Sequence, residues 1–183
     1  MFRRSPGRPL RRARAGAVPP ALRHANQLMV SGQYGPAAEI LEQFARGALT
    51  RGGPRAPWLF LQAGRARLLA GQVLVGMSHF QQGLSLFAAR GQQQQLHQAG
   101  NRLVAELKER GLAAEARQVE DYLKTALPSG FAAVPVPDGT RPRPVLPTDC
   151  PDCGAPIRSD EVEWLDEVTA ECPYCGSAVR AEG

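Results

Sequence analysis

The sequence predicts a mainly α-helical protein that carries a small β module near its C-terminal end. Apolar residues recur at helical spacing from about residue 20 to residue 126, and glycine turns divide that stretch at regular intervals. All four cysteines lie in two short copies of one motif, "CPDCG" at 150–154 and "CPYCG" at 172–176. The chain has 183 residues and is 43% hydrophobic, which is enough for a modest buried core.

The first 18 residues form a basic segment with six Arg and no acidic residue. Pro6, Gly7 and Pro9 interrupt both an apolar signal-peptide core and a helix, so we expect residues 1–18 to be a basic disordered tail. A transit peptide or a misassigned start would share this composition. Since no run approaches the ~20 apolar residues of a membrane span, we expect a cytoplasmic protein that does not cross a membrane.

Charge divides the chain into two parts of opposite sign. Residues 1–105 hold 14 Arg and two acidic residues, a net charge of +12, whereas residues 128–183 hold four Arg and ten acidic residues, a net charge of −6. One hypothesis follows: the acidic C-terminal module associates with the basic helical part of its own chain or of a second copy, through an attraction that salt would screen.

Glycines separate the predicted helices into hairpins. Gly32, Gly71 and Gly111 are 39 and 40 residues apart, and each follows one apolar-periodic stretch and precedes another. Small or slender residues, Ala25, Gly64 and Val104, stand seven positions before these glycines and allow two helices to approach closely. The pattern predicts six helices, near residues 20–31, 36–48, 57–70, 73–89, 94–109 and 112–126.

This arrangement of turn glycines and small residues resembles the tetratricopeptide repeat over about residues 19–127. The spacing exceeds the ~34 residues of that family, and the surplus lies between the hairpins, at 50–57 and 90–98. In the third copy Glu120 occupies an expected apolar position, which suits an outer helix facing solvent. An ordinary helical bundle is the alternative.

The resemblance implies a binding face along the first helix of each hairpin, with a protein or an acidic peptide as the partner. The partner-binding candidates on that face are Arg23, Asn26, Trp58, Arg65 and Arg102. Family members that clamp a carboxylate use five polar residues there. Asn26 and Arg102 match this set, whereas Leu22, Gln62 and Gln98 occupy the other three positions.

Proline marks the boundary between the helices and the cysteines. Six prolines lie in residues 128–148, a density that removes helix donors and favours extended polyproline conformations. We therefore expect a semi-rigid or disordered linker there.

The cysteines at 149–180 resemble a four-cysteine zinc ribbon. Cys150, Cys153, Cys172 and Cys175 form two C-x-x-C pairs, and Gly154 and Gly176 permit the tight turn in which backbone amides can reach the sulfurs. Val162 and Trp164 alternate with charged residues, as a half-exposed strand would. About thirty residues cannot fold alone, so we expect one structural Zn²⁺ to stabilise them. A rubredoxin-like iron site is the alternative.

Sequence patterns for catalysis are few. His24, His79 and His97 lie on different predicted helices without a partner cluster and are expected at the surface, and "QQQQ" at 92–95 indicates a polar helix start or loop. We therefore expect a non-enzymatic protein-interaction adaptor. The alternatives are a nucleic-acid-associated protein that uses the basic tail and helical array, or a rubredoxin-like electron carrier.

Overall fold

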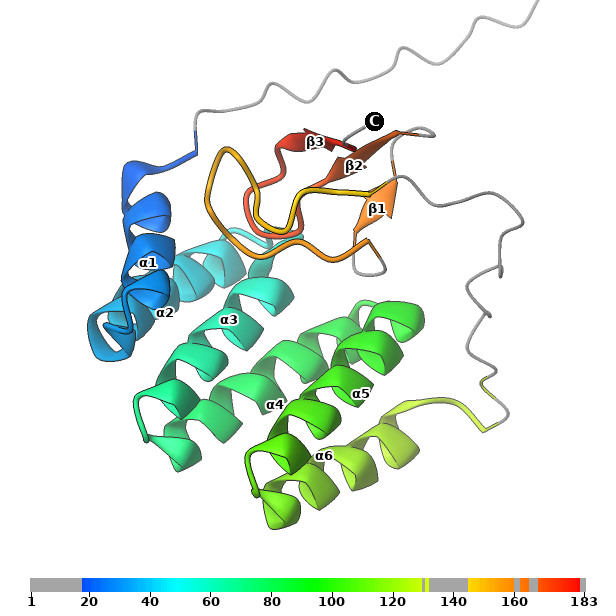
Figure 1. Cartoon of the computed structure of the whole chain (residues 1–183). Helices are drawn as coiled ribbons and strands as arrows, with labels where there is room; N and C mark the ends of the chain where they lie inside the picture. Colours follow the sequence, from blue (N-terminus) through cyan, green and yellow to red (C-terminus); the bar gives the residue numbers. More distant parts are fainter. Residues whose placement is uncertain (1–17, 130, 132–144, 160–161, 165–167, 182–183) are drawn as a thin grey trace, which may run out of the picture.

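Six helices and three short strands make up the fold in a computed structural model that describes residues 18–129, 131, 145–159, 162–164 and 168–181 (Figure 1). The helices are α1 (Pro20–Val30), α2 (Tyr34–Thr50), α3 (Ala56–Leu69), α4 (Val73–Ala89), α5 (Gln93–Glu109) and α6 (Ala113–Ala126). The predicted mainly α fold is confirmed. The predicted basic tail, residues 1–18, lies outside the described residues except for Val18, which is buried.

Glycine ends the first helix of each hairpin. Gly32, Gly71 and Gly111 have φ angles of 77°, 78° and 76°, a region that residues with a Cβ rarely adopt. The amide of the following residue bonds a carbonyl five residues back, for example Gln33 N to Leu28 O at 2.8 Å. These bonds satisfy carbonyls that the helix leaves unpaired, and they confirm the predicted helix–turn–helix hairpins.

Small residues bring α3 and α4 into backbone contact. A Cβ placed on Gly64 would lie 2.9 Å from the Gly76 carbonyl oxygen and 2.6 Å from a ring carbon of Phe80. A Cβ on Gly76 would likewise lie 2.9 Å from the Gly64 carbonyl oxygen. The crossing predicted from small residues is therefore present, and it depends on both glycines.

A three-stranded antiparallel sheet closes the C-terminal part, in the order β1 (Glu163–Trp164), β2 (Thr169–Glu171) and β3 (Ala178–Arg180). Trp164 pairs with Ala170, and Ala170 pairs with Val179. We call the described residues from 145 to 181 the cysteine module. Leu146, inside the predicted linker, is buried, and the Thr148 carbonyl accepts a bond from the Ile157 amide at 2.8 Å. The packed module therefore begins before residue 149.

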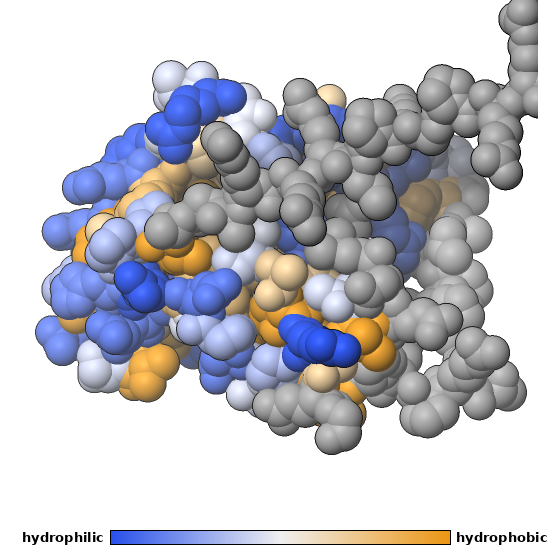
Figure 2. Space-filling model, turned by 90° about the horizontal axis from the view of Figure 1, so that it is seen from above, coloured by the Kyte–Doolittle hydropathy of each residue, from blue (hydrophilic) through white to orange (hydrophobic). Residues whose placement is uncertain are grey.

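The cysteine module and the helical array share one hydrophobic core. The buried set runs from Leu22, Phe60 and Phe87 in the helices to Ile157 and Val179 in the module. Figure 1 shows the module above α3 and beside α1. On the face seen from above, the described apolar residues form small, separate patches among polar ones (Figure 2). No described helix has both the length and the apolar character that a membrane crossing requires.

Candidate metal centre

Two matching turns hold the cysteines. In the first, the Gly154 amide donates to the Cys150 carbonyl at 2.8 Å and the Cys150 amide donates to Ala155 at 2.8 Å. In the second, Gly176 donates to Cys172 at 2.8 Å and Cys172 to Ser177 at 2.9 Å. Gly154 and Gly176 have φ angles of 71° and 78°, so each turn ends in a conformation that favours glycine. We call these turns, 150–154 and 172–176, the two knuckles.

The four sulfurs converge on one point. Their Sγ atoms all lie within 4.8 Å of one another, with Cys150 and Cys175 at 3.7 Å and Cys153 and Cys172 at 3.9 Å. A tetrahedral ion with metal–sulfur bonds of about 2.3 Å places its ligands about 3.8 Å apart. The four cysteines are therefore positioned to hold one metal ion, with one ligand from each residue.

Crowding of the sulfurs changes their acidity. Hydrogen bonding with Cys153 lowers the pKa of the Cys150 thiol to about 7, and hydrogen bonding with Cys150 lowers the pKa of Cys175. The pKa values of Cys153 and Cys172 are raised, in both cases chiefly by hydrogen bonding with Cys150. A bound cation favours the thiolate form of all four, so protons and metal compete for this site.

The first knuckle contacts α1. Asn26 Nδ2 donates to the Cys153 carbonyl oxygen at 2.7 Å, and Gln62 Nε2 of α3 donates to Asn26 Oδ1. Asn26 is 2% exposed and Gln62 is 3% exposed, so this relay is closed to solvent. A donor or acceptor in this contact cannot reach water, so losing its hydrogen-bond partner would cost the full penalty of burying an unpaired polar group.

The second knuckle contacts the start of α3. Arg55 Nη2 bonds Glu171 Oε1 at 3.0 Å, and the same guanidinium lies where a Cβ on Gly176 would be, with Nη2 1.3 Å from that position. The Tyr174 ring meets Trp58 edge to face, with 6.5 Å between ring centroids. Both knuckles therefore rest on the first-helix layer of the array within one chain.

The partner-binding candidates divide between two environments. Asn26 and Trp58 are buried and contact the cysteine module or its neighbours. Arg23 is exposed on α1, Arg65 pairs with Glu106 of α5 at 2.9 Å, and Arg102 is half-buried on α5. Trp58 lines the cleft described below, and the other four candidates are not among its lining residues. Their role in binding a partner stays a prediction.

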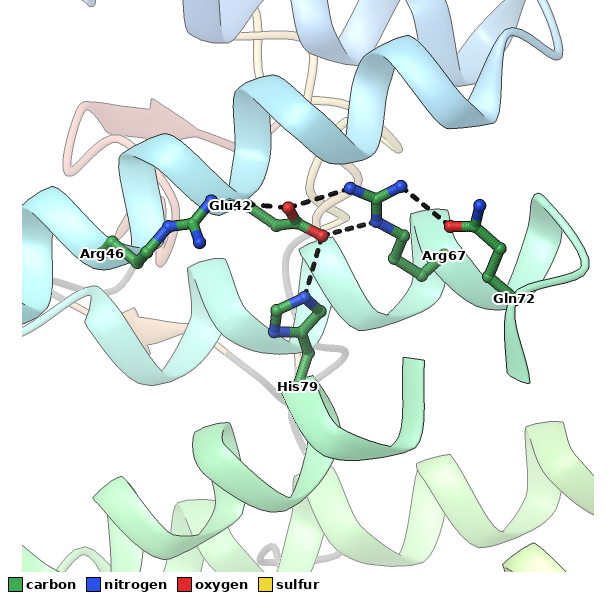
Figure 3. A network of polar contacts seen from close by, with 5 residues as sticks. All are labelled: Glu42, Arg46, Arg67, Gln72 and His79. Atoms are coloured by element: carbon green, nitrogen blue, oxygen red, sulfur yellow. Dashed lines mark hydrogen bonds and ion pairs between the residues drawn. The ribbon is translucent and has the colours of Figure 1, made fainter. Parts of the chain in front are cut away.

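A second polar cluster joins three helices and corrects one expectation. Glu42 of α2 accepts from Arg67 of α3 through two nitrogens and lies 2.9 Å from His79 Nε2 of α4, while Arg46 approaches at 3.5 Å (Figure 3). The Arg67 hydrogen bond lowers the pKa of Glu42. The sequence predicts His79 at the surface without partners. This is wrong, because its side chain is only 15% exposed, pairs with Glu42 and stacks on Phe60.

A cleft opens between α5, the start of α3 and the cysteine module. Its volume is about 440 Å³, and its lining includes Pro54, Arg55, Trp58, Gln92, Gln94, Gln95, Gln98, Val162, Glu171 and Pro173. Gln93 begins α5, so the glutamine run is a polar helix start as expected. The sequence does not predict this cleft, because only the fold brings residues near 55, 95 and 171 together.

Comparisons of the chain with protein-family models, with curated proteins and with solved structures found no match.

Proposed function

We propose that the protein is a non-enzymatic interaction adaptor, built from a tetratricopeptide-like helical array and a zinc-ribbon-like module with one structural Zn²⁺. The glycine-ended hairpins support the first part, and the four converging thiols support the second. Four thiolates complete a tetrahedral shell and leave no position for a substrate. A reducing compartment such as the cytoplasm would keep these cysteines available as ligands.

Zinc is favoured over iron by the surroundings of the sulfurs. Both ions accept four thiolates in tetrahedral geometry, so the sulfur spacing supports either. The resemblance to rubredoxin implies several aromatic rings packed around an iron, whereas the module offers Trp164 and Tyr174. Absorbance of the purified protein separates the two ions, because a ferric thiolate site is coloured and a Zn²⁺ site is not.

The cleft between α5 and the module is the single observation that carries the adaptor proposal. Its volume of about 440 Å³ falls in the range of ligand sites. Arg55 Nε, Gln92 Oε1 and Gln94 Oε1 are buried and make no hydrogen bond within the described residues. One unmatched donor and two unmatched acceptors suit the C=O and N–H groups of an extended peptide.

Selection from a displayed peptide library, with the full metal-loaded chain as bait, tests this proposal. We expect the selected peptides to bind at least tenfold more weakly to a Gln95→Ala, Gln98→Ala double variant, because both side chains line the cleft. Gln93→Ala is the matched control, since Gln93 is exposed at the start of the same helix and does not line the cleft. Equal binding by all three proteins would contradict the proposal.

A nucleic-acid-associated protein is the second candidate, favoured by the net charge of +12 over residues 1–105. Phosphate contacts of this kind weaken steeply with salt. Binding to generic RNA or DNA at physiological ionic strength that is lost on deleting residues 1–18 would favour this candidate over the adaptor.

A further inference from the structure

We propose that the helical array supplies the outer shell of the metal centre, so that metal binding and closure of the module over α1 and α3 are coupled. The proposal concerns the chain alone and does not depend on the identity of any partner. It rests on contacts that reach both knuckles from the array.

The peptide unit between Cys153 and Gly154 is held from two sides. Its oxygen accepts the bond from Asn26 Nδ2 at 2.7 Å, and its N–H donates to the Cys150 carbonyl at 2.8 Å. Rotation of this unit would break one bond or the other and would turn the adjoining Cys153 sulfur away from the cage. Groups that orient metal ligands in this way usually change metal affinity by 10–100-fold when they are removed.

Gln62 fixes Asn26 in turn. Its Nε2 donates to Asn26 Oδ1, which leaves the Asn26 amide hydrogens directed away from Gln62 and toward the knuckle. Both side chains are almost completely buried. Buried polar side chains in proteins almost always have hydrogen-bond partners. Here the first knuckle supplies the partner, because its Cys153 carbonyl accepts the bond from Asn26.

Arg55 holds the second knuckle by a different contact. Its guanidinium occupies the space beside Gly176 and pairs with Glu171, the residue before Cys172. Asn26 therefore bonds the backbone of Cys153 in the first knuckle. At the second knuckle, Arg55 contacts the side chain of Glu171 and the space beside Gly176, the neighbours of Cys172 and Cys175.

Coupling follows from thermodynamic linkage. Bound metal stabilises the folded form of a small four-cysteine module, and only the folded knuckles present the Cys153 carbonyl and the Gly176 backbone in the positions that Asn26 and Arg55 contact. Docking must therefore strengthen metal binding by the same factor by which metal strengthens docking. Loss of the metal is expected to release the module and to expose Trp58, which is 8% exposed when the module is docked.

Competition titrations of the full chain with Co²⁺ and Zn²⁺ test the first half of the proposal. We expect Asn26→Leu, which keeps the side-chain size and removes the donor, to bind both ions at least tenfold more weakly than the wild type. Asn101→Leu is the matched control, because Asn101 is exposed on α5 and its Nδ2 lies 3.0 Å from His97 Nε2 of the same helix. The metal affinity of this variant should stay within twofold of the wild type. A lower helical circular dichroism would mean that Asn26→Leu disturbs the helices. In that case Arg55→Met, with Arg51→Met as its control, repeats the test at the second knuckle.

Oxidative footprinting read by mass spectrometry tests the second half. We expect the oxidation of Trp58 to rise severalfold when a chelator removes the metal, and to fall back when Zn²⁺ is restored. The proposal is overturned if the folded Asn26→Leu and Arg55→Met variants bind metal as tightly as the wild type. It is also overturned if Trp58 stays equally protected with and without the metal.

Discussion

Arg55 lies against the backbone of Gly176, 121 residues away in the sequence, at the point where a side chain on residue 176 would stand. Two features of the structure therefore favour glycine at residue 176. Its φ angle of 78° disfavours any Cβ, and the space that a Cβ would occupy is already filled.

We expect Gly176→Ala to destabilise the metal-loaded module more than Gly154→Ala does. Both substitutions place a Cβ at a positive φ, which costs about 1–2 kcal/mol. Only the first also displaces Arg55, because a Cβ on Gly154 would meet nothing closer than Asn26 Cβ at 3.6 Å. Thermal unfolding of the Zn²⁺-loaded variants measures the difference, which should vanish in an Arg55→Met background. Equal losses in the wild-type background would contradict this explanation.

Gly64→Ala should destabilise the helical array by about 1–3 kcal/mol, the usual cost of overpacking. The added methyl would overlap the Phe80 ring and the Gly76 carbonyl, and backbone cannot move aside easily. Gly35→Ala in α2 is the control, since nothing lies within 4 Å of its Cβ position. That change should stabilise the chain by about 0.5–1 kcal/mol, because alanine favours a helix. Urea denaturation gives both values, and a neutral Gly64→Ala would refute the close crossing.

Glu42→Gln should cost about 3 kcal/mol, since it leaves Arg67 and His79 without their buried carboxylate. Arg67 holds the pKa of Glu42 below its usual value of 4.5 in the folded chain. The stabilisation is therefore complete above the unfolded-state pKa and is lost as the pH falls through the lower folded-state pKa. Between pH 7 and pH 3, the free energy of unfolding should decrease less in Glu42→Gln than in the wild type. Glu109→Gln, at the exposed end of α5, should behave like the wild type.

Much of this fold can be predicted from the sequence, because the residues that end its helices act locally. All six helices lie within two residues of the predicted bounds, since a glycine with positive φ ends a helix wherever it stands. The knuckles are local in the same sense, because each needs only a C-x-x-C-G segment.

The contact between the module and the array could not be read in that way. The position of Asn26 matches a carboxylate clamp, yet its side chain bonds a backbone carbonyl 127 residues away. Leu146 lies between prolines in the predicted linker, and its side chain is buried. The spacing of apolar residues along the chain does not predict contacts between two segments that are far apart in the sequence.

Charge alone does not account for this docking. Among the described residues, the contacts between the module and the array include the Arg55–Glu171 ion pair, a buried hydrogen bond and aromatic packing. We therefore expect small-angle scattering of the metal-loaded chain to give the same compact dimensions at low and high ionic strength. Expansion at high salt would instead support attraction between the basic and acidic parts as the main force. A doubled mass at low salt would indicate docking between copies.

Elemental analysis of the purified chain tests the central claim most directly. We expect one Zn²⁺ per wild-type chain and none in Cys153→Ser or Cys175→Ser. The helical circular dichroism of the two variants should stay close to that of the wild type, since residues 20–126 contain all six helices. A wild-type chain that binds no metal, or variants that retain it at full occupancy, would contradict the account.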